Sequence, residues 1–187
     1  MELSDLIKKR SHRKEELLKV FKKEKIKVYL AGPIWQVEEN QSYRKTLTDG
    51  LLAISPKFEI HDPWAREQKE FGGKGVHFGA LMEDEEKKLV AEDIITSDLK
   101  DIYDCDLIIA YFFKVKGETT YTGTSCEIFW MYRILKKPVI VVYTKAFKKG
   151  APLWVYGNSS IIFSNISNLF KWLKEELEEN VNEEKKS

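Results

Sequence analysis

The chain has 187 residues, which is enough for one domain with a sizeable core but crowded for two. Its 31 basic and 30 acidic residues leave a formal net charge of +1, which argues against electrostatic binding of nucleic acid or an anionic membrane as the main task. The cysteines, Cys105 and Cys126, form no CxxC or Cys/His pattern, so we expect a reducing compartment and no zinc site. Because the chain shows neither a signal-peptide core nor an apolar run of about 20 residues, we expect a soluble, cytoplasmic protein.

The amino-terminal residues, 1–25, are rich in Lys and Arg and carry apolar residues at roughly helical spacing. This pattern predicts one or two amphipathic helices that precede the core fold as an extension. The core domain is expected over residues 26–179, and residues 180–187 are expected to form a frayed tail of acidic and basic residues.

The first core strand is predicted over residues 25–31, and it runs into Gly32 and Pro33. Glycine permits close backbone approach and proline prevents further strand pairing, so a ligand can lie against this turn. An apolar stripe over residues 38–54 then predicts a helix.

A short strand over residues 58–61 leads into Asp62, Pro63 and Trp64. The glycine-containing stretch that follows, 71–79, has neither the GxGxxG pattern nor the ending of a phosphate loop. We therefore expect a mobile active-site loop there.

Two helices are predicted before the central strand. The first covers residues 81–96, and its expected buried contacts are Leu89, Val90, Ile94 and Ile95. The second is a separate short helix over 97–106, with Asp98 at its amino end and Ser97 as a plausible cap. Asp98 therefore has two interpretations, a capping residue or a functional carboxylate.

Glu127 stands just after a Gly/Thr/Ser turn, where a helix is expected to begin. The apolar runs on either side, 107–113 and 139–143, have the length and content of strands buried in a parallel sheet, and residues 136–138 end the helix between them. Helix starts in such units lie at the carboxyl edge of the sheet, where open α/β folds bind ligands. We interpret Glu127 as a nucleophile; the alternative is a carboxylate that caps the first helical turn.

A last short strand over 161–163 and an amphipathic terminal helix over 169–177 complete the pattern. The alternation of strands and helices predicts an α/β fold. We expect a single-domain, three-layer sandwich with a Rossmann- or flavodoxin-like parallel sheet of about five strands.

Three segments carry a family resemblance: Val28-Tyr-Leu-Ala-Gly-Pro33, then residues 97–110 with Asp98 before the central strand, then Gly123-Thr-Ser-Cys-Glu127 followed by 137–142. In this order and spacing they resemble the nucleoside 2-deoxyribosyltransferase family, which includes related nucleoside and nucleotide N-glycosidases. The resemblance spans roughly residues 27–143.

The resemblance implies that Glu127 is the nucleophile, that Asp98 lies beside the nucleobase and helps to manage its proton, and that Tyr29 positions the glutamate. These roles agree with the chemistry. Cleavage of an N-glycosidic bond builds positive charge at C1′ that a carboxylate can trap as an ester, and the departing base needs a proton. If a second base attacks the ester, the protein is a transferase; if water attacks, it is a hydrolase. No cofactor is implied.

The candidate substrate-binding residues follow the strand ends and the turn before Glu127. They are Gly32, Pro33, Trp35, Asp62, Trp64, Glu118, Gly123 and Ser125. Many transferases of the family carry an aspartate for the sugar hydroxyls shortly before the glycine turn, and here only Glu118 stands nearby. The turn at 33–37 lacks the cation that nucleotide-cleaving relatives use for a 5′-phosphate, which favours a nucleoside.

Several candidates have structural alternatives. Trp35 and Trp64 can stack on a base or pack in the core. Asp62 precedes a proline at a strand end, where a turn role is common, and His61 is interpreted as a structural histidine.

A rival hypothesis is a noncatalytic module that senses a nucleotide and has no need of Glu127. The presence of both Asp98 and Glu127 favours an enzyme. The family resemblance also implies a homo-oligomer, with nucleosides and nucleobases as partners.

Overall fold

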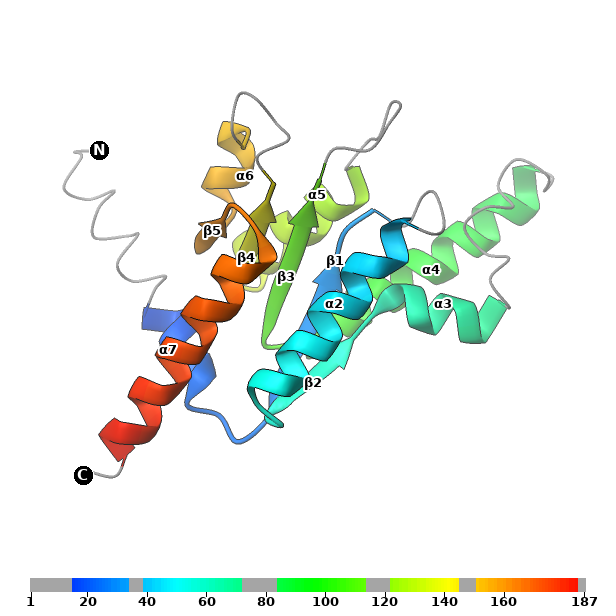
Figure 1. Cartoon of the computed structure of the whole chain (residues 1–187). Coiled ribbons are helices and arrows are strands. Elements are labelled where there is room, and N and C mark those ends of the chain that lie inside the picture. Colours follow the sequence, from blue (N-terminus) through cyan, green and yellow to red (C-terminus); the bar gives the residue numbers. More distant parts are fainter. Residues whose placement is uncertain (1–14, 34–38, 72–83, 114–121, 145–150, 185–187) are drawn as a thin grey trace.

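The computed structural model describes residues 15–33, 39–71, 84–113, 122–144 and 151–184 (Figure 1). Residues 15–21 are helical. The strands are β1 (Ile26–Ala31), β2 (Phe58–His61), β3 (Leu107–Phe112), β4 (Val139–Tyr143) and β5 (Ile161–Phe163). The helices are α2 (Glu39–Ile54), α3 (Pro63–Phe71), α4 (Asp84–Asp104), α5 (Thr122–Phe129), the π-helical turn η2 (Trp130–Ile134), α6 (Leu153–Gly157) and α7 (Ile166–Glu184).

The strands form one parallel sheet in the order β2-β1-β3-β4-β5. This is the order of flavodoxin-like folds, in which the chain crosses the sheet between β1 and β3 and leaves a crevice at their carboxyl ends. The single-domain α/β fold and the parallel sheet of about five strands that the sequence predicts are thus confirmed.

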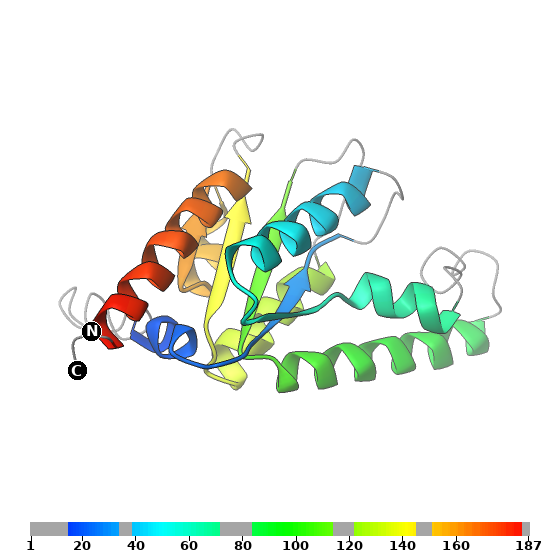
Figure 2. The same ribbon diagram turned by 60° about the horizontal axis from the view of Figure 1, so that its bottom comes forward.

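Helices cover both faces of the sheet, as the two views in Figures 1 and 2 show. Residues 15–21, α2 and α7 contribute side chains to one buried cluster with the strands. The other face packs against α4, α5, η2 and α6. The described end of the predicted amino-terminal extension packs on the core, since Leu17 and Phe21 are buried in the same cluster as Leu169 and Leu173.

Strand β1 sends alternate side chains to the two layers. Val28 and Leu30 belong to the cluster under α2 and α7, whereas Tyr29 and Ala31 belong to the cluster under α4 and α5. Side chains alternate between the two faces along a strand, so the side chain of residue 29 points toward the layer of α4 and α5. This alternation positions the tyrosine of the candidate site.

The prediction of two helices over 81–106 is wrong, because α4 runs without a break from Asp84 to Asp104. No proline or glycine interrupts this stretch, so nothing ends the helix at residues 96 and 97. Leu89 and Ile95, which were expected to be buried, are 65% and 57% exposed. Figure 2 shows the reason: the amino-terminal half of α4 extends beyond the sheet beside α3.

The terminal helix is longer than predicted, since α7 covers Ile166–Glu184 rather than 169–177. Residues 180–184, expected to be a frayed tail, continue this helix. The helix after Glu127 ends as expected before Pro138, with Lys136 in the left-handed region at φ 58°. Among the helices described, none is both long and apolar enough to cross a membrane.

Candidate active site

The centre of the candidate site is a hydrogen bond between Tyr29 and Glu127. Tyr29 is fully buried on β1, and its hydroxyl donates to Oε1 of Glu127 at 2.7 Å. The two residues are 98 positions apart in sequence. Both lie near the carboxyl end of β1, at the crevice where flavodoxin-like sheets bind ligands.

Glu127 lies in the second turn of its helix. Helix α5 begins at Thr122, so the expectation that Glu127 occupies the first helical turn is wrong. The exposed backbone N–H groups of a helix belong to its first turn, and a side chain one turn later does not cap them. The capping alternative for Glu127 is therefore removed.

Burial raises the pKa of Glu127 from its usual 4.5 to about 7, and the negative charge of Asp98 adds to the effect. The hydrogen bond from Tyr29 and the charge of Arg44 act in the opposite direction. The ionised and neutral forms of this carboxyl group are thus both populated near neutral pH. Such a shift at the ligand edge of a sheet is typical of a functional carboxylate.

Asp98 lies in the interior of α4 and not at a helix start, so the alternative that Ser97 or Asp98 caps a helix is removed. Its Oδ1 accepts a hydrogen bond from Nη2 of Arg66 at 2.7 Å. Burial raises the pKa of Asp98, while Arg66 and a hydrogen-bonding effect of Tyr29 lower it. The structure thus brings Tyr29, Asp98 and Glu127 together from β1, α4 and α5.

Arg66 is a site residue that sequence reasoning missed. From α3 it binds Asp98 through one terminal nitrogen and Asp101 through the other, so one guanidinium group holds two carboxylates of α4. The only sequence signal was its position in a charged stretch soon after a strand end. Its partners lie more than 30 positions away, which local patterns do not reveal.

Arg44 was also missed, although it adjoins Tyr43 in the apolar stripe of α2. It is 3% exposed, and its guanidinium donates to the backbone oxygens of Leu30 and Gly32, both at 3.0 Å. It also binds Oδ1 of Asp62 at 2.6 Å. Arg44 therefore ties the end of β1 to the end of β2 and fixes the turn at the site.

The turn at Gly32 and Pro33 is closely packed. A Cβ added at Gly32 would overlap the Tyr43 hydroxyl and press on the backbone oxygen of Tyr111. Gly32 therefore permits a close approach to its backbone, as expected. The groups that approach it are the Tyr43 hydroxyl and the Tyr111 backbone oxygen. The Tyr43 hydroxyl also donates to the backbone oxygen of Pro33 at 3.4 Å.

Asp62 has the turn role that the sequence allowed and also a pocket role. Its Oδ1 accepts the backbone N–H of Trp64 at 3.1 Å, which caps α3 at its start. Trp64 itself is partly buried. Of the other predicted binding residues, Gly123 is exposed and Ser125 partly buried in the first turns of α5. Trp35, Glu118 and the predicted active-site loop from 72 onward lie outside the described residues.

Glu67 is a third missed residue, and it lies one position after Arg66. It is 2% exposed, and both of its carboxylate oxygens are buried without a hydrogen-bond partner in the described structure. Burial raises its pKa from 4.5 to about 7, and the charge of Asp98 contributes to the same rise. The charge of Glu67 in turn raises the pKa of Glu127, so the two groups belong to one electrostatic site.

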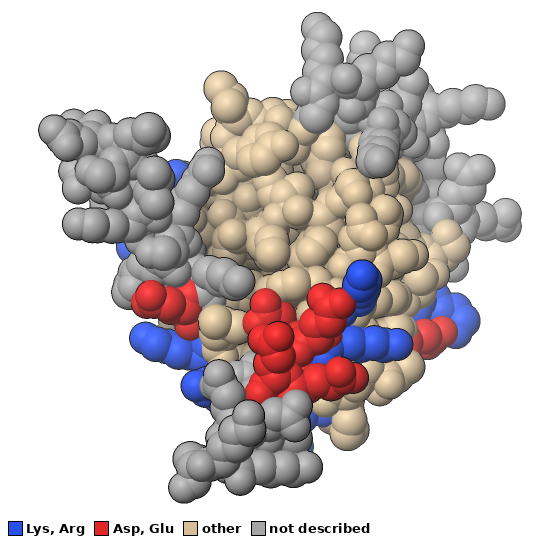
Figure 3. Space-filling model, turned by 60° about the vertical axis from the view of Figure 1, so that its left-hand side comes forward, with Lys and Arg blue, Asp and Glu red and all other residues tan. Residues whose placement is uncertain are grey.

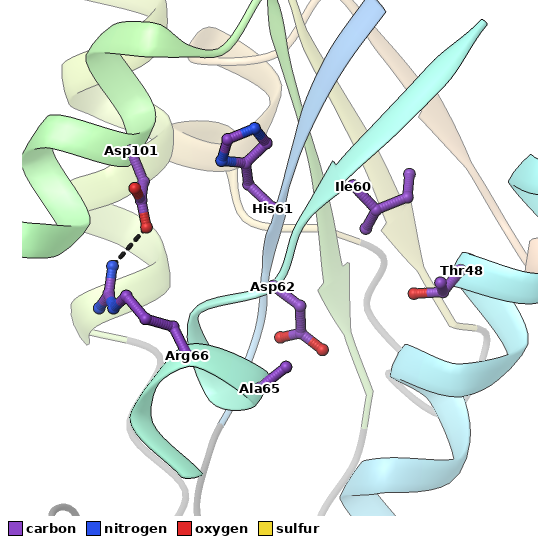
Figure 4. Close-up of a pocket in the computed structure, with 7 residues that line it drawn as sticks. All are labelled: Thr48, Ile60, His61, Asp62, Ala65, Arg66 and Asp101. Atoms are coloured by element: carbon purple, nitrogen blue, oxygen red, sulfur yellow. Dashed lines mark hydrogen bonds and ion pairs between the residues drawn. The ribbon is translucent and has the colours of Figure 1, made fainter. Parts of the chain in front are cut away.

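A cavity of about 430 Å³ opens at the edge of β2 (Figure 4). Its described lining is Thr48, Ile60, His61, Asp62, Ala65, Arg66 and Asp101. In Figure 4, His61 and Arg66 lie on the side of α4, whereas Ile60 points toward α2. Glu127 is not among these lining residues. The cavity is connected to the candidate site through Arg66, which lines the cavity and binds Asp98. In the described part of the chain, no three His, Cys, Asp or Glu side chains are grouped so as to hold a metal ion.

No protein-family model matches the chain, and no curated protein matches it. Among solved structures, it is similar to a conserved protein from Enterococcus faecalis V583, with 18% identity, a TM-score of 0.59 and coverage of 81% of this chain and 98% of that one. It is also similar to the 2-deoxyribosyltransferase of Bacillus psychrosaccharolyticus, with 21% identity, a TM-score of 0.57 and coverage of 77% and 90%. A third similar structure is the 2-deoxyribosyltransferase of Leishmania mexicana, with 14% identity, a TM-score of 0.50 and coverage of 80% of this chain and 97% of that one. The resemblance inferred from the sequence motifs is confirmed at the level of the fold.

Proposed function

We propose, on the premise of a fold shared with known 2-deoxyribosyltransferases, that this chain is a nucleoside 2-deoxyribosyltransferase. It would cleave the N-glycosidic bond of a 2′-deoxynucleoside and transfer the sugar to another nucleobase, a reaction suited to nucleotide salvage. The observation that carries the proposal is the hydrogen bond from Tyr29 to Glu127, with Asp98 beside both.

Glu127 acts as the nucleophile. Its ionised oxygen attacks C1′ on the face opposite the base, and a glutamyl-deoxyribose ester forms as the C1′–N bond breaks. The hydroxyl of Tyr29 holds Oε1 in place and stabilises the ionised carboxylate before the attack. A second base then attacks C1′ and releases Glu127, so the configuration at C1′ is retained.

Asp98 helps to manage the proton that the departing base requires, as the family resemblance implies. Its charge also raises the pKa of Glu127, which supports a position near the reacting group. Gly32 and Pro33 form the closely packed turn that follows β1 beside the site. Asp62 and Trp64 follow the end of the neighbouring strand, β2. Trp35, Glu118, Gly123 and Ser125 remain candidates for contacts with the substrate.

The reaction is tested by incubating the protein with deoxyinosine, with and without adenine, and separating the products by chromatography. Deoxyadenosine formation supports transfer. Hypoxanthine release without an acceptor indicates that water attacks the ester, and the protein is then an N-glycosidase. Binding without turnover would replace the proposal by a nucleotide sensor.

The nucleophile is tested with Glu127→Ala, which should abolish turnover and the deoxyribosyl mass increment on the peptide that contains Glu127. The matched control is Glu92→Gln, which changes an exposed carboxylate of α4 and should leave the rate unchanged. Full activity in Glu127→Ala would contradict the assignment.

A homo-oligomer is part of the proposal, and an exposed apolar surface supports it. Leu153 is 88% exposed on α6, and Trp154 stacks on Phe129 of α5 with ring centroids 6.3 Å apart while both remain exposed. Figure 3 looks onto the side of α6 and α7 and shows a broad uncharged area beside a group of acidic side chains. Exposed apolar side chains such as those of Leu153, Trp154 and Phe129 are typical of interaction surfaces.

A cytoplasmic location is also proposed. Both cysteines are free thiols, with Cys105 buried and Cys126 exposed, which fits a reducing compartment.

A further inference from the structure

Asp98 lies on a part of α4 that core packing does not anchor. The amino-terminal half of this helix extends beyond the sheet (Figure 2), and Leu89 and Ile95 are largely exposed. Of the described side chains of α4, Ile102 is the first one that is buried. Because helices in proteins are held mainly by packing of an apolar face, the segment around Asp98, one turn before Ile102, depends on other contacts for its position.

Arg66 supplies such contacts from α3. Its Nη2 donates to Oδ1 of Asp98 at 2.7 Å, and its Nη1 donates to Oδ2 of Asp101. The two aspartates are three positions apart in α4, so they share a face of the helix and one guanidinium fork reaches both. The side chains of Arg66, Asp98 and Asp101 are 18%, 17% and 26% exposed, so water screens these charge-assisted hydrogen bonds only in part.

Arg66 is itself held in place by hydrogen bonds that begin at α2. Arg44 donates to Oδ1 of Asp62 at 2.6 Å, and the same oxygen accepts the backbone N–H of Trp64 at 3.1 Å. The backbone N–H of Arg66 donates to the backbone oxygen of Asp62 at 3.2 Å. The first turn of α3 is thus attached to the end of β2, and a row of hydrogen bonds runs from α2 through this turn to Asp98.

Asp98 interacts with charged and titratable groups of β1, α3, α4 and α5. These groups are Tyr29, Arg66, Glu67, Asp101 and Glu127. Burial raises the pKa of Asp98 and the charge of Asp101 adds to the rise, whereas Arg66 lowers this pKa through its hydrogen bond and its charge. Arg66 therefore brings positive charge to a group of acidic side chains.

We propose that Arg66 is a positioning residue of the reaction, and that its fork on Asp98 and Asp101 holds the Asp98 carboxylate at the site. The inference rests on the proposed function, in which Asp98 helps to manage the proton of the departing base. Arg66 exchanges no proton itself, because a guanidinium group stays charged over the physiological pH range. It lies outside the three motifs of the family resemblance, so the resemblance assigns it no role.

The test compares two leaving groups in Arg66→Lys, a variant that keeps the positive charge but loses the fork. Deoxyinosine releases a base that requires a proton, whereas N7-methylated deoxyinosine already carries a positive charge and releases a neutral base. A displaced Asp98 should therefore affect the first substrate selectively. Arg66→Lys should lower kcat on deoxyinosine by about 10–100-fold, with its KM and the rate on the methylated substrate within about threefold of wild type.

Lys69→Met, which changes an exposed cation of the same helix, is the matched control and should follow wild type on both substrates. Equal losses on both substrates in Arg66→Lys would assign a structural role to Arg66 and overturn the proposal. Wild-type rates on both substrates in Arg66→Lys would overturn it as well. A wild-type protein that cleaves neither substrate would remove the proposed function.

Hydrogen exchange tests the position of Asp98 without turnover. Amide exchange is compared between wild type, Arg66→Lys and Arg66→Met, and β3 serves as an internal reference for an intact fold. Exchange over residues 94–101 should become at least about tenfold faster in both variants, while exchange over β3 stays unchanged. Unchanged exchange over 94–101 would show that Arg66 does not hold this segment, and it would overturn the proposal whether or not the protein turns over either substrate.

Discussion

The hydroxyl of Tyr29 and the carboxylate of Glu127 meet at 2.7 Å although they lie on a central strand and on a helix 98 positions later. The tyrosine is fully buried and its own pKa is raised well above the usual value, first by burial and then by the charge of Glu127. It therefore stays a neutral hydrogen-bond donor over the physiological pH range. The hydrogen bond therefore restrains the proposed nucleophile and opposes the rise in its pKa that burial causes.

Removal of that hydroxyl in Tyr29→Phe should lower kcat/KM by about 10–100-fold, since hydrogen bonds to charged groups contribute about 1.5–3 kcal/mol. The bond lowers the pKa of Glu127, so its loss should also move the rising limb of the pH–rate profile to higher pH. Tyr111→Phe is the matched control, because Tyr111 belongs to the opposite layer and stacks on Tyr43. A Tyr29→Phe profile that coincides with wild type would contradict the positioning role.

Loss of Arg66 should raise the pKa of Asp98 and lower the free energy of unfolding. In Arg66→Met the pKa of Asp98 should rise further, because the guanidinium hydrogen bond that lowers it is gone. The free energy of unfolding should fall by about 1–3 kcal/mol, because two partly buried carboxylates lose their charged hydrogen-bond donor. Urea denaturation measures the second effect, with Lys69→Met, which changes an exposed cation of the same helix, as the control. Equal stabilities of the two variants would show that the Arg66 ion pairs contribute little.

Glu67 should make stability depend on pH in a defined direction. Its pKa is about 7 in the folded protein against about 4.5 when exposed, so the folded state holds more protons between these values. The free energy of unfolding must therefore fall as pH rises through this window. Glu67→Gln removes this group's contribution and should be more stable than wild type at about pH 8, by about 1–3 kcal/mol, with little difference near about pH 4.5.

Urea denaturation at both pH values measures this difference, and Glu92→Gln should follow wild type at each. A Glu67→Gln variant that loses stability equally at both values would show that the ionised form of Glu67 is not disfavoured in the fold.

A side chain at Gly32 should destabilise the turn at the end of β1. A Cβ there meets the Tyr43 hydroxyl and the Tyr111 backbone, so Gly32→Ala should cost about 1–3 kcal/mol in unfolding free energy. Gly123→Ala is the stability control, since nothing lies within 4 Å of its added Cβ and alanine favours the helix. Thermal unfolding distinguishes the two variants, and similar Tm values would contradict the close packing at Gly32.

The exposed surface of α6 should carry the proposed homo-oligomer. Wild type is expected to sediment as an oligomer in analytical ultracentrifugation, and Leu153→Asp should shift the distribution toward monomer because it places a charge in an apolar contact. Leu52→Asp, which changes an exposed leucine of α2, should leave the distribution unchanged. A monomeric wild type would remove this part of the proposal.

The sequence by itself determined the fold class, a three-layer α/β sandwich with a parallel sheet of about five strands, whereas the strand order came from the structure. Apolar runs such as 107–113 and 139–143 have the length and content of strands buried on both faces of a parallel sheet, and the helical stripes between them indicate parallel crossovers. The same local reasoning identified Glu127, which follows the turn where a helix was expected to begin, whereas the role of Tyr29 came only from the resemblance to the nucleoside 2-deoxyribosyltransferase family. It failed where a helix continued through Ser97 and Asp98, since neither residue type ends a helix without help from its surroundings.

Only the tertiary structure decided which charges meet. Arg44, Arg66 and Glu67 are ordinary charged residues in amphipathic helices until α2, α3 and α4 converge beside β1. Their roles depend on burial and on partners more than 30 positions away, as with Arg66 and Asp98, and no local spacing encodes these. A pKa likewise depends on desolvation and on the distance to other charges, so the burial that raises the pKa values of Glu67 and Asp98, and the Arg66 hydrogen bond that lowers the pKa of Asp98, exist only in the folded chain.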